Sequence, residues 1–226
     1  MDTALLSLDL HSIEKLREQE LEEARVIQNV MMPAHPLCHA GVTISHEFQP
    51  VTEVGGDYLD YFKLSDETIG LYVGDVSGKG LPAALYAALA VGTLRGIHKT
   101  GMEPERVLSL LNQRLLLRGI PGRCSAIQYA LFDPAGSRMR IVSAGMPGPL
   151  LLRGSDSRVL QIAGLPPGYS PQRATTSSCW NWNPVILSSF SRMASATLAI
   201  SMTRSLESMA SRTSATATPA NRPSIS

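Results

Sequence analysis

The spacing of hydrophobic residues near the N-terminus predicts one helix followed by one strand. Residues Ser12–Met32 carry an uneven apolar stripe at spacings of three and four residues, which is typical of a helix. We expect Ser12 to cap this helix, because its hydroxyl can accept bonds from first-turn N–H groups. Pro33 should end the helix, because the residue before a proline avoids the helical conformation. Val42–Pro50 then alternates apolar and polar residues, as a half-buried strand does.

The central part of the chain consists of two short apolar runs followed by two longer amphipathic stretches. Tyr58–Leu64 and Ile69–Val73 predict a pair of strands joined by a polar turn. The alanine-rich stretch Leu81–His98 predicts a largely buried helix. Glu103–Arg118 predicts a second helix with one apolar face.

Three further strands are predicted beyond these helices, at Ser125–Phe132, Arg138–Ser143 and Pro149–Leu152. Strands, then two helices, then more strands is an order typical of an α+β fold. The periodic pattern fades from about Tyr169, where Ser, Thr, Ala and Arg dominate. We therefore expect a low-complexity, disordered tail, although the two tryptophans in Cys179–Asn183 fit such a tail poorly.

Composition limits the classes of partner. The chain has 226 residues and a net charge of +1, so no strong field marks it for nucleic acid or for a membrane surface. It contains no long apolar run, and its N-terminus carries Asp2 and Asp9 without a basic start. We expect a soluble, cytoplasmic protein with no nucleic-acid and no membrane partner.

The cysteines and histidines form no recognisable metal or disulfide pattern. The three cysteines, Cys38, Cys124 and Cys179, are odd in number and widely spaced, which fits a reducing cytoplasm. His35 and His39 are four residues apart, but the proline between them argues against one helical metal-binding face.

Two aspartates stand where the chain changes direction, within the stretch Val54–Gly80. Asp57 follows Gly55-Gly56, where we expect the backbone to bend without a Cβ penalty, and Asp75 follows a short apolar strand. Carboxylate oxygens on loops suit hard divalent cations such as Mg²⁺ and Mn²⁺. Aspartates also cap turns frequently, so the residues alone leave both roles open.

A phosphate-binding loop can be rejected for the same region. Gly74–Lys79 approaches the P-loop pattern, but the spacing is one residue short, Gly80 replaces Ser or Thr, and Asp75 would repel phosphate. A nucleotide-binding domain is therefore disfavoured. Lys79 either contacts a phosphate or is simply a solvated loop lysine. The N-terminus of the helix predicted at Leu81 faces this loop, and its dipole favours an anion there.

Several short motifs occur together along about two-thirds of the chain. Glu22–Gly80 contains ARVIQ, MMP, VGGDYLDYF and YVGDVSGKG, and the last runs on into LPAAL. Ala144–Leu152 reads AGMPGPLLL, and Gly164–Gly168 reads GLPPG. Together these motifs resemble the bacterial serine phosphatases of the PPM (PP2C-like) family, of the RsbU and SpoIIE type.

This resemblance implies a fold, a cofactor and a substrate. The implied fold is a sandwich of two antiparallel β-sheets flanked by helices, with metal ions at one end. The implied catalytic residues are Asp57 and Asp75, which together with the backbone of Val76 would bind Mn²⁺ or Mg²⁺, two ions in an intact member. The implied reaction is hydrolysis of phosphoserine or phosphothreonine on a regulatory protein, such as an anti-sigma-factor antagonist.

The resemblance also suggests three parts of the chain. We expect a helical linker or switch segment at residues 1–35, an incomplete phosphatase domain at residues 36–168 and an aberrant Ser/Thr-rich tail at residues 169–226. In the family the first segment joins a sensor domain to the phosphatase. Few residues precede it here, so we expect no sensor domain in this chain. The helix either packs on its own domain or pairs with a second copy to form a homodimer.

The tail has an alternative interpretation at the level of codons. Where this tail begins, the family has a stretch like LELEPGDSVLLFSDGxTDA. Joining the third base of each codon to the first two of the next converts Cys179–Asn183 necessarily into Leu-Glu-Leu-Glu, because Trp has a single codon. The same shift turns Met193-Ala194 into Gly. We therefore hypothesise a frameshift between about Tyr169 and Ser178, in the gene or in its recorded sequence.

A frameshift at this point would have chemical consequences. It would remove the SDG aspartate and a later aspartate that bind metal in the family. It would also leave the closing strands of the sandwich missing or disordered. The alternative to an active phosphatase is therefore a catalytically inactive remnant or docking module.

Overall fold

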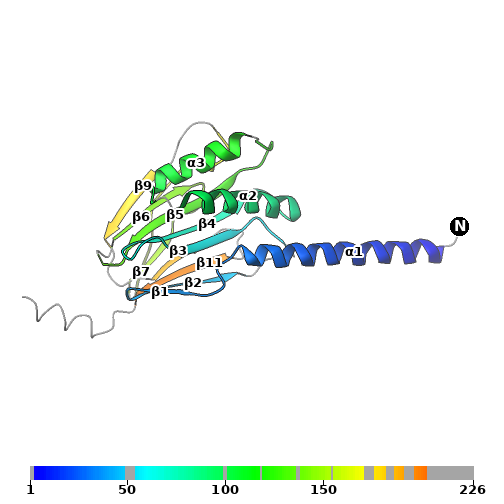
Figure 1. The fold of residues 1–226 in the computed structure, drawn as a ribbon, viewed down its shortest axis with the longest axis horizontal. Coiled ribbons are helices and arrows are strands. Elements are labelled where there is room, and N and C mark those ends of the chain that lie inside the picture. The colour runs from blue at the N-terminus through cyan, green and yellow to red at the C-terminus, as the bar shows by residue number, and fades with distance from the viewer. Residues whose placement is uncertain are drawn as a thin grey trace, which may run out of the picture.

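The computed structural model describes residues 3–48, 54–98, 101–117, 119–135, 138–153, 155–170, 176–181, 186–190 and 196–202. These residues form two antiparallel sheets that stack face to face, with two helices on the outside of one sheet and one long helix projecting from the body (Figure 1). This arrangement confirms the α+β class expected from the order of the elements and the two-sheet sandwich that the family resemblance implied.

The first sheet has five strands in the order β3-β4-β5-β6-β9, and all its neighbours pair antiparallel. Its strands are β3 (Tyr58–Lys63), β4 (Ile69–Val76), β5 (Ser125–Asp133), β6 (Arg138–Ala144) and β9 (Thr176–Asn181). The interior strand β4 is buried along almost its whole length, because both of its faces are covered.

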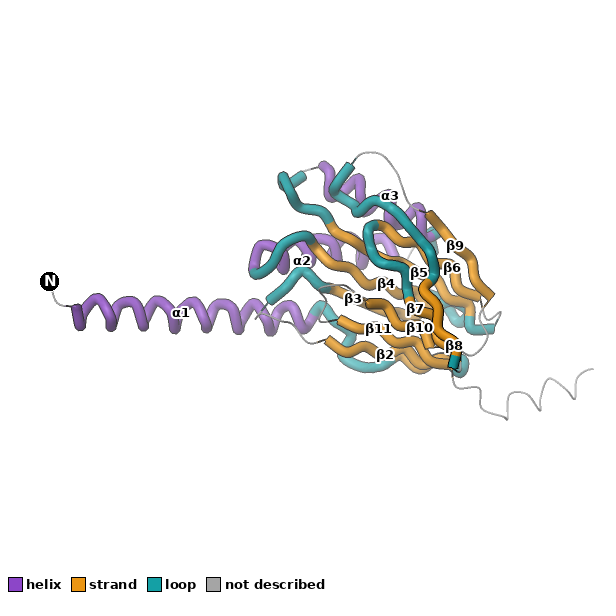
Figure 2. Tube along the Cα trace, turned by 180° about the vertical axis from the view of Figure 1, so that it is seen from behind, coloured by secondary structure: helices purple, strands orange, loops and turns teal. Residues whose placement is uncertain are grey.

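The second sheet has six strands in the order β1-β2-β11-β10-β7-β8. Its strands are β1 (Leu37–His39), β2 (Val42–Phe48), β7 (Leu150–Arg153), β8 (Asp156–Val159), β10 (Ile186–Phe190) and β11 (Ala196–Met202). Figure 2 shows the molecule from behind and labels β2, β11, β10, β7 and β8 of this sheet.

The space between the sheets is filled by side chains that alternate along strands such as β2, β3 and β4. Leu59 and Tyr61 of β3, Leu71 and Val73 of β4 and Ile44 of β2 all belong to this core. Every second residue of a strand reaches this core, because successive side chains point to opposite faces of a sheet.

The opposite face of the five-stranded sheet is covered by α2 (Leu81–Ile97) and α3 (Pro104–Leu117), which form a second core with it (Figure 1). Ala83, Ala87 and Ala90 are fully buried, which lets α2 approach the sheet closely. Both helices agree with the sequence-based prediction to within a residue or two.

The N-terminal helix α1 spans Thr3–Val30 and extends away from the sheets (Figure 1). It begins nine residues before the predicted start, so Ser12 lies inside the helix and the prediction that it caps the N-terminus was wrong. Near its C-terminal end the helix packs on its own domain, where Gln28 is buried, whereas Leu10 and Ile13 in its outer half are exposed.

The tail differs from the sequence-based expectation in three places. Instead of missing closing strands, the structure has β9 beside β6, and β10 and β11 between β7 and β2. The physical reason is that these neighbours would otherwise present unpaired backbone N–H and C=O groups along their edges. Residues 203–226 lie outside the described part of the chain.

Candidate metal centre

Asp57 immediately precedes β3 and Asp75 lies near the end of β4, so the register of these strands brings the two residues to facing positions. The last ladder pair of β3 and β4 is Tyr58 with Gly74, and one further step in the same register pairs Asp57 with Asp75. The Val76 amide donates a hydrogen bond of 3.2 Å to the Gly56 carbonyl, so the register continues past both aspartates. Directly opposite residues have Cα atoms about 4.5 to 5.5 Å apart.

The two aspartates belong to the same face of the sheet. Residues two apart on a strand share a face, so Asp57 lies on the side of Leu59, and Asp75 lies on the side of Val73. Leu59 and Val73 both belong to the core between the sheets. The pair is therefore placed at the end of the sandwich, on its inner side, with Asp57 buried and Asp75 partly buried.

Gly56 allows the two loops to come together. A Cβ atom at this position would lie 2.6 Å from the carbonyl oxygen of Val76, closer than real contacts permit. Gly55 has free space around its Cα, and neither glycine has a positive φ. Glycine is needed at residue 56 for close backbone approach, and not for the unusual bend that the sequence suggested.

The partly buried position of Asp75 disfavours the charged form of its carboxyl. Burial raises the pKa of the Asp75 carboxyl, because removing water disfavours its charged form. Two carboxylates and the Val76 carbonyl supply hard oxygen donors, which fit Mg²⁺ or Mn²⁺. Among the described residues, no group of three His, Cys, Asp or Glu side chains gathers that could hold a metal ion.

Gln28 of α1 clamps the loop that carries Asp57, and sequence reasoning missed this role. Its side-chain amide donates a hydrogen bond of 2.7 Å to the Gly55 carbonyl and accepts one of 3.1 Å from the Gly55 amide. The same nitrogen lies 3.5 Å from the Asp57 carbonyl. Gln28 is 3% exposed. The available signal was the ARVIQ motif of the sequence, of which Gln28 is the last residue.

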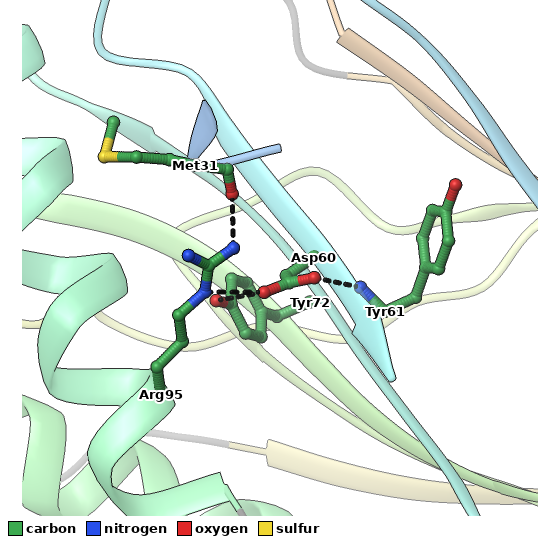
Figure 3. A network of polar contacts seen from close by, with 5 residues as sticks. All are labelled: Met31, Asp60, Tyr61, Tyr72 and Arg95. Atoms are coloured by element: carbon green, nitrogen blue, oxygen red, sulfur yellow. Dashed lines mark hydrogen bonds and ion pairs between the residues drawn. The ribbon is translucent and has the colours of Figure 1, made fainter. Parts of the chain in front are cut away.

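A second polar network ties the same helix end to the body (Figure 3). Arg95 of α2 donates to the Asp60 carboxylate at 2.9 Å and to the Met31 carbonyl at 2.7 Å. Asp60 also accepts bonds from the Tyr72 hydroxyl and the Tyr61 amide. The C-terminal end of α1 is therefore held from two sides, by Gln28 at the candidate metal centre and by Arg95 next to it.

Of the remaining residues considered in the sequence, Cys38 and His39 belong to β1 of the other sheet, whereas Cys124 and Lys79 belong to the loops near Asp75. The ring of His39 hydrogen-bonds the Asp66 carbonyl at 2.8 Å, and Cys38 is exposed. Cys124 is a free thiol at the start of β5. Lys79 is exposed on the loop between Asp75 and α2.

Comparison with solved structures identifies the class of fold. The structure resembles the SiaA-PP2C domain of Pseudomonas aeruginosa with a TM-score of 0.65 and 20% identity, over 78% of this chain and 73% of that one. It also resembles the RsbU and RsbW domains of Rv1364c from Mycobacterium tuberculosis, with a TM-score of 0.61 and 18% identity, over 76% and 61% of the two chains. The fold is that of PP2C-type phosphatases.

Comparison of the sequence with family models and curated proteins identifies the family of this chain. The model of stage II sporulation protein E (SpoIIE) matches residues 65–184, and the chain belongs to this family. Phosphoserine phosphatase RsbU of Bacillus subtilis is 29% identical over 104 residues, which are 46% of this chain and 31% of RsbU. Phosphoserine phosphatase RsbP of the same organism is 28% identical over 155 residues, 66% of this chain and 38% of RsbP. The chain spans about a third of the length of these relatives.

No helix in the described part of the chain is long and apolar enough to cross a lipid bilayer.

Proposed function

We propose that this chain is a metal-dependent protein serine/threonine phosphatase, with Mn²⁺ or Mg²⁺ as its cofactor. The observation that carries the proposal is the register of β3 and β4, which sets Asp57 opposite Asp75 at the inner end of the sandwich. The substrate we propose is a phosphorylated regulatory protein of the anti-sigma-factor antagonist type. The family to which RsbU and RsbP are related supports that choice.

Asp57, Asp75 and the Val76 carbonyl would hold the ions, two of them in a complete site. Bound divalent metal supplies a nucleophilic hydroxide at neutral pH and neutralises charge on the phosphoryl oxygens. Other residues of the chain hold the loops that carry these ligands in place. Gln28 fixes the loop before Asp57, and Gly56 lets that loop lie against Val76.

We also propose that α1 pairs with a second copy of the chain in a cytoplasmic homodimer. Leu10, Ile13 and Leu16 are each more than 60% exposed on the part of α1 that leaves the body. Apolar residues on a projecting helix are costly in water and are covered when two helices pack. The molar mass in solution, measured by light scattering for the wild type and for Ile13→Glu, tests this pairing.

An inactive remnant or docking module is the second candidate. It is favoured by one observation, that the described residues bring only two carboxylates together where the family uses a larger acidic cluster. Under this alternative the frame-restored protein is active, whereas the present chain is weak or inactive.

Release of phosphate from a phosphoserine peptide, with and without Mn²⁺, tests the proposed function. We expect Mn²⁺-dependent release, weak in this chain and stronger in a frame-restored version, and its loss in Asp57→Asn and Asp75→Asn. Calorimetric titration with Mn²⁺ adds a readout that does not need turnover. A chain that binds Mn²⁺ through both aspartates without releasing phosphate would support the inactive remnant, and unchanged binding in both variants would refute the metal site.

A further inference from the structure

Arg123 lies against the loop that follows Asp75. The last ladder pair of β4 and β5 is Val76 with Ser125, and the Ser77 amide continues the register by donating to the Cys124 carbonyl at 2.9 Å. The next step pairs Gly78 with Arg123. The guanidinium of Arg123 donates a hydrogen bond to the Ser77 carbonyl, so the side chain folds back over this loop.

Gly78 makes room for that guanidinium. A Cβ atom on Gly78 would overlap a terminal nitrogen of Arg123, and Gly78 has a φ of 102°. Ser77 anchors the same two segments a second time, because its hydroxyl donates to the Gly122 carbonyl and accepts from the Cys124 amide. The loop of residues 119–124 and the loop that follows Asp75 are therefore one surface, which we call the Arg123 rim.

The Arg123 rim carries positive charge. Within the described residues Arg123 forms no ion pair with an acidic side chain, unlike Arg25, Arg95 and Arg140, which do. Lys79 is exposed on the same rim. The first turn of α2 begins two residues later at Leu81, and its N-cap, Gly80, has no side-chain cap, so the positive end of the helix dipole lies at the rim.

The rim stands beside the carboxylate pair and not over it. Ser77 follows Asp75 by two residues, which is about 7 Å along an extended strand. Arg123 and its ladder partner Gly78 belong to the face of the sheet that α2 and α3 cover. Asp75 belongs to the opposite face, which points into the core between the sheets. A phosphoserine at the metal centre would therefore place the neighbouring residues of its own chain, and not its phosphate, at Arg123.

We propose that Arg123 is a specificity-determining residue that binds a carboxylate side chain flanking the phosphorylated residue of the protein substrate. This inference rests on the proposed function. The guanidinium fork matches a carboxylate in two parallel hydrogen bonds, and a half-buried site strengthens them relative to open solvent. The exposed Ile120 on the same loop adds an apolar contact for the substrate chain.

The test compares three substrates in the presence of Mn²⁺: a phosphoserine peptide with flanking Asp and Glu, the same peptide with flanking Lys, and p-nitrophenyl phosphate. We expect Arg123→Ala to lower kcat/KM for the acidic peptide about 10-fold and to leave p-nitrophenyl phosphate within about 2-fold. Arg123→Glu should reverse the preference in favour of the Lys-flanked peptide. Arg106→Ala is the matched control, because Arg106 is exposed near the start of α3, about 16 Å along the helix from its end at Leu117, after which the Arg123 loop follows.

A binding measurement keeps the inference testable if this chain does not turn over. Fluorescence anisotropy with the labelled acidic phosphopeptide should show about 10-fold weaker binding by Arg123→Ala and a smaller dependence of Kd on salt. Equal effects of Arg123→Ala and Arg106→Ala would overturn the inference, as would an equal loss on all three substrates, which would indicate a structural role. If the wild type binds neither peptide, the inference is also overturned. If the chain binds the acidic phosphopeptide selectively but does not hydrolyse it, only the proposed phosphatase activity is refuted, and the role of Arg123 in binding stands.

Discussion

The substitution Gln28→Ala separates the role of α1 from that of the metal centre. It removes both hydrogen bonds that the side chain makes to Gly55, and leaves one N–H and one carbonyl of the loop without their protein partners. A buried polar group that loses its partner costs about 1 to 3 kcal/mol. Gly55 is only partly buried, and water can satisfy part of this loss, so we expect a total near 2 kcal/mol.

This energy is local to the loop before Asp57, so amide hydrogen exchange measures it directly. A loss of about 2 kcal/mol corresponds to exchange at Gly55 that is roughly 30-fold faster. We expect Mn²⁺ affinity, measured by calorimetry, to fall in the same variant, because part of the binding energy must then order the loop. Gln19→Ala is the matched control, since Gln19 is exposed on the same helix. Unchanged exchange at Gly55 together with unchanged Mn²⁺ affinity would refute the clamp.

Three further predictions concern the centre and the tail. Gly56→Ala should lower the free energy of unfolding by about 1 to 3 kcal/mol, because the new Cβ would meet the Val76 backbone. Gly55→Ala, the control, should change this free energy by no more than about 0.5 kcal/mol, and denaturant melts measure both. The pKa of the Asp75 carboxyl is higher in the folded protein than in the unfolded chain, because burial favours the neutral form. The neutral carboxyl therefore stabilises the fold at low pH, and this stability is lost as the pH rises through the folded pKa. Metal-free Asp75→Asn should therefore melt higher than wild type near pH 7, and this difference should shrink toward pH 4; a difference independent of pH would contradict it. Sequencing the codons for Cys179–Asn183 and those after them should spell SDG in the shifted frame, and any other outcome ends the frameshift hypothesis.

Local patterns were sufficient for most of the secondary structure. The helices α2 and α3 and the strands β3 to β6 occur where spacing and turn residues predicted them, because each buries a face that its own sequence marks as apolar. The start of α1 was missed because residues 3–11 contain no helix breaker, so Ser12 is a plausible cap that the helix does not need. A cap signal permits a helix to begin but does not oblige it to.

The strands of the tail could not be predicted from local pattern. β10 and β11 fill the gap between β7 and β2, and β9 extends the edge at β6. Their partners lie far away in sequence, for example Ala196 beside Phe48. Strand pairing of this kind depends on edges that exist only once the rest of the sheet has formed, and a window of sequence carries no information about those edges.

The sequence by itself determined which chemistry is available: two aspartates beside glycines, in motifs that resemble one family of phosphatases. Only the tertiary structure decided how these residues meet. The antiparallel register of β3 and β4 sets Asp57 opposite Asp75, and the ends of α1 and β5 bring Gln28 and Arg123 to the same two loops. The physical reason is that hydrogen-bonded ladders and helix packing fix distances between residues far apart in the chain, whereas sequence spacing constrains only near neighbours.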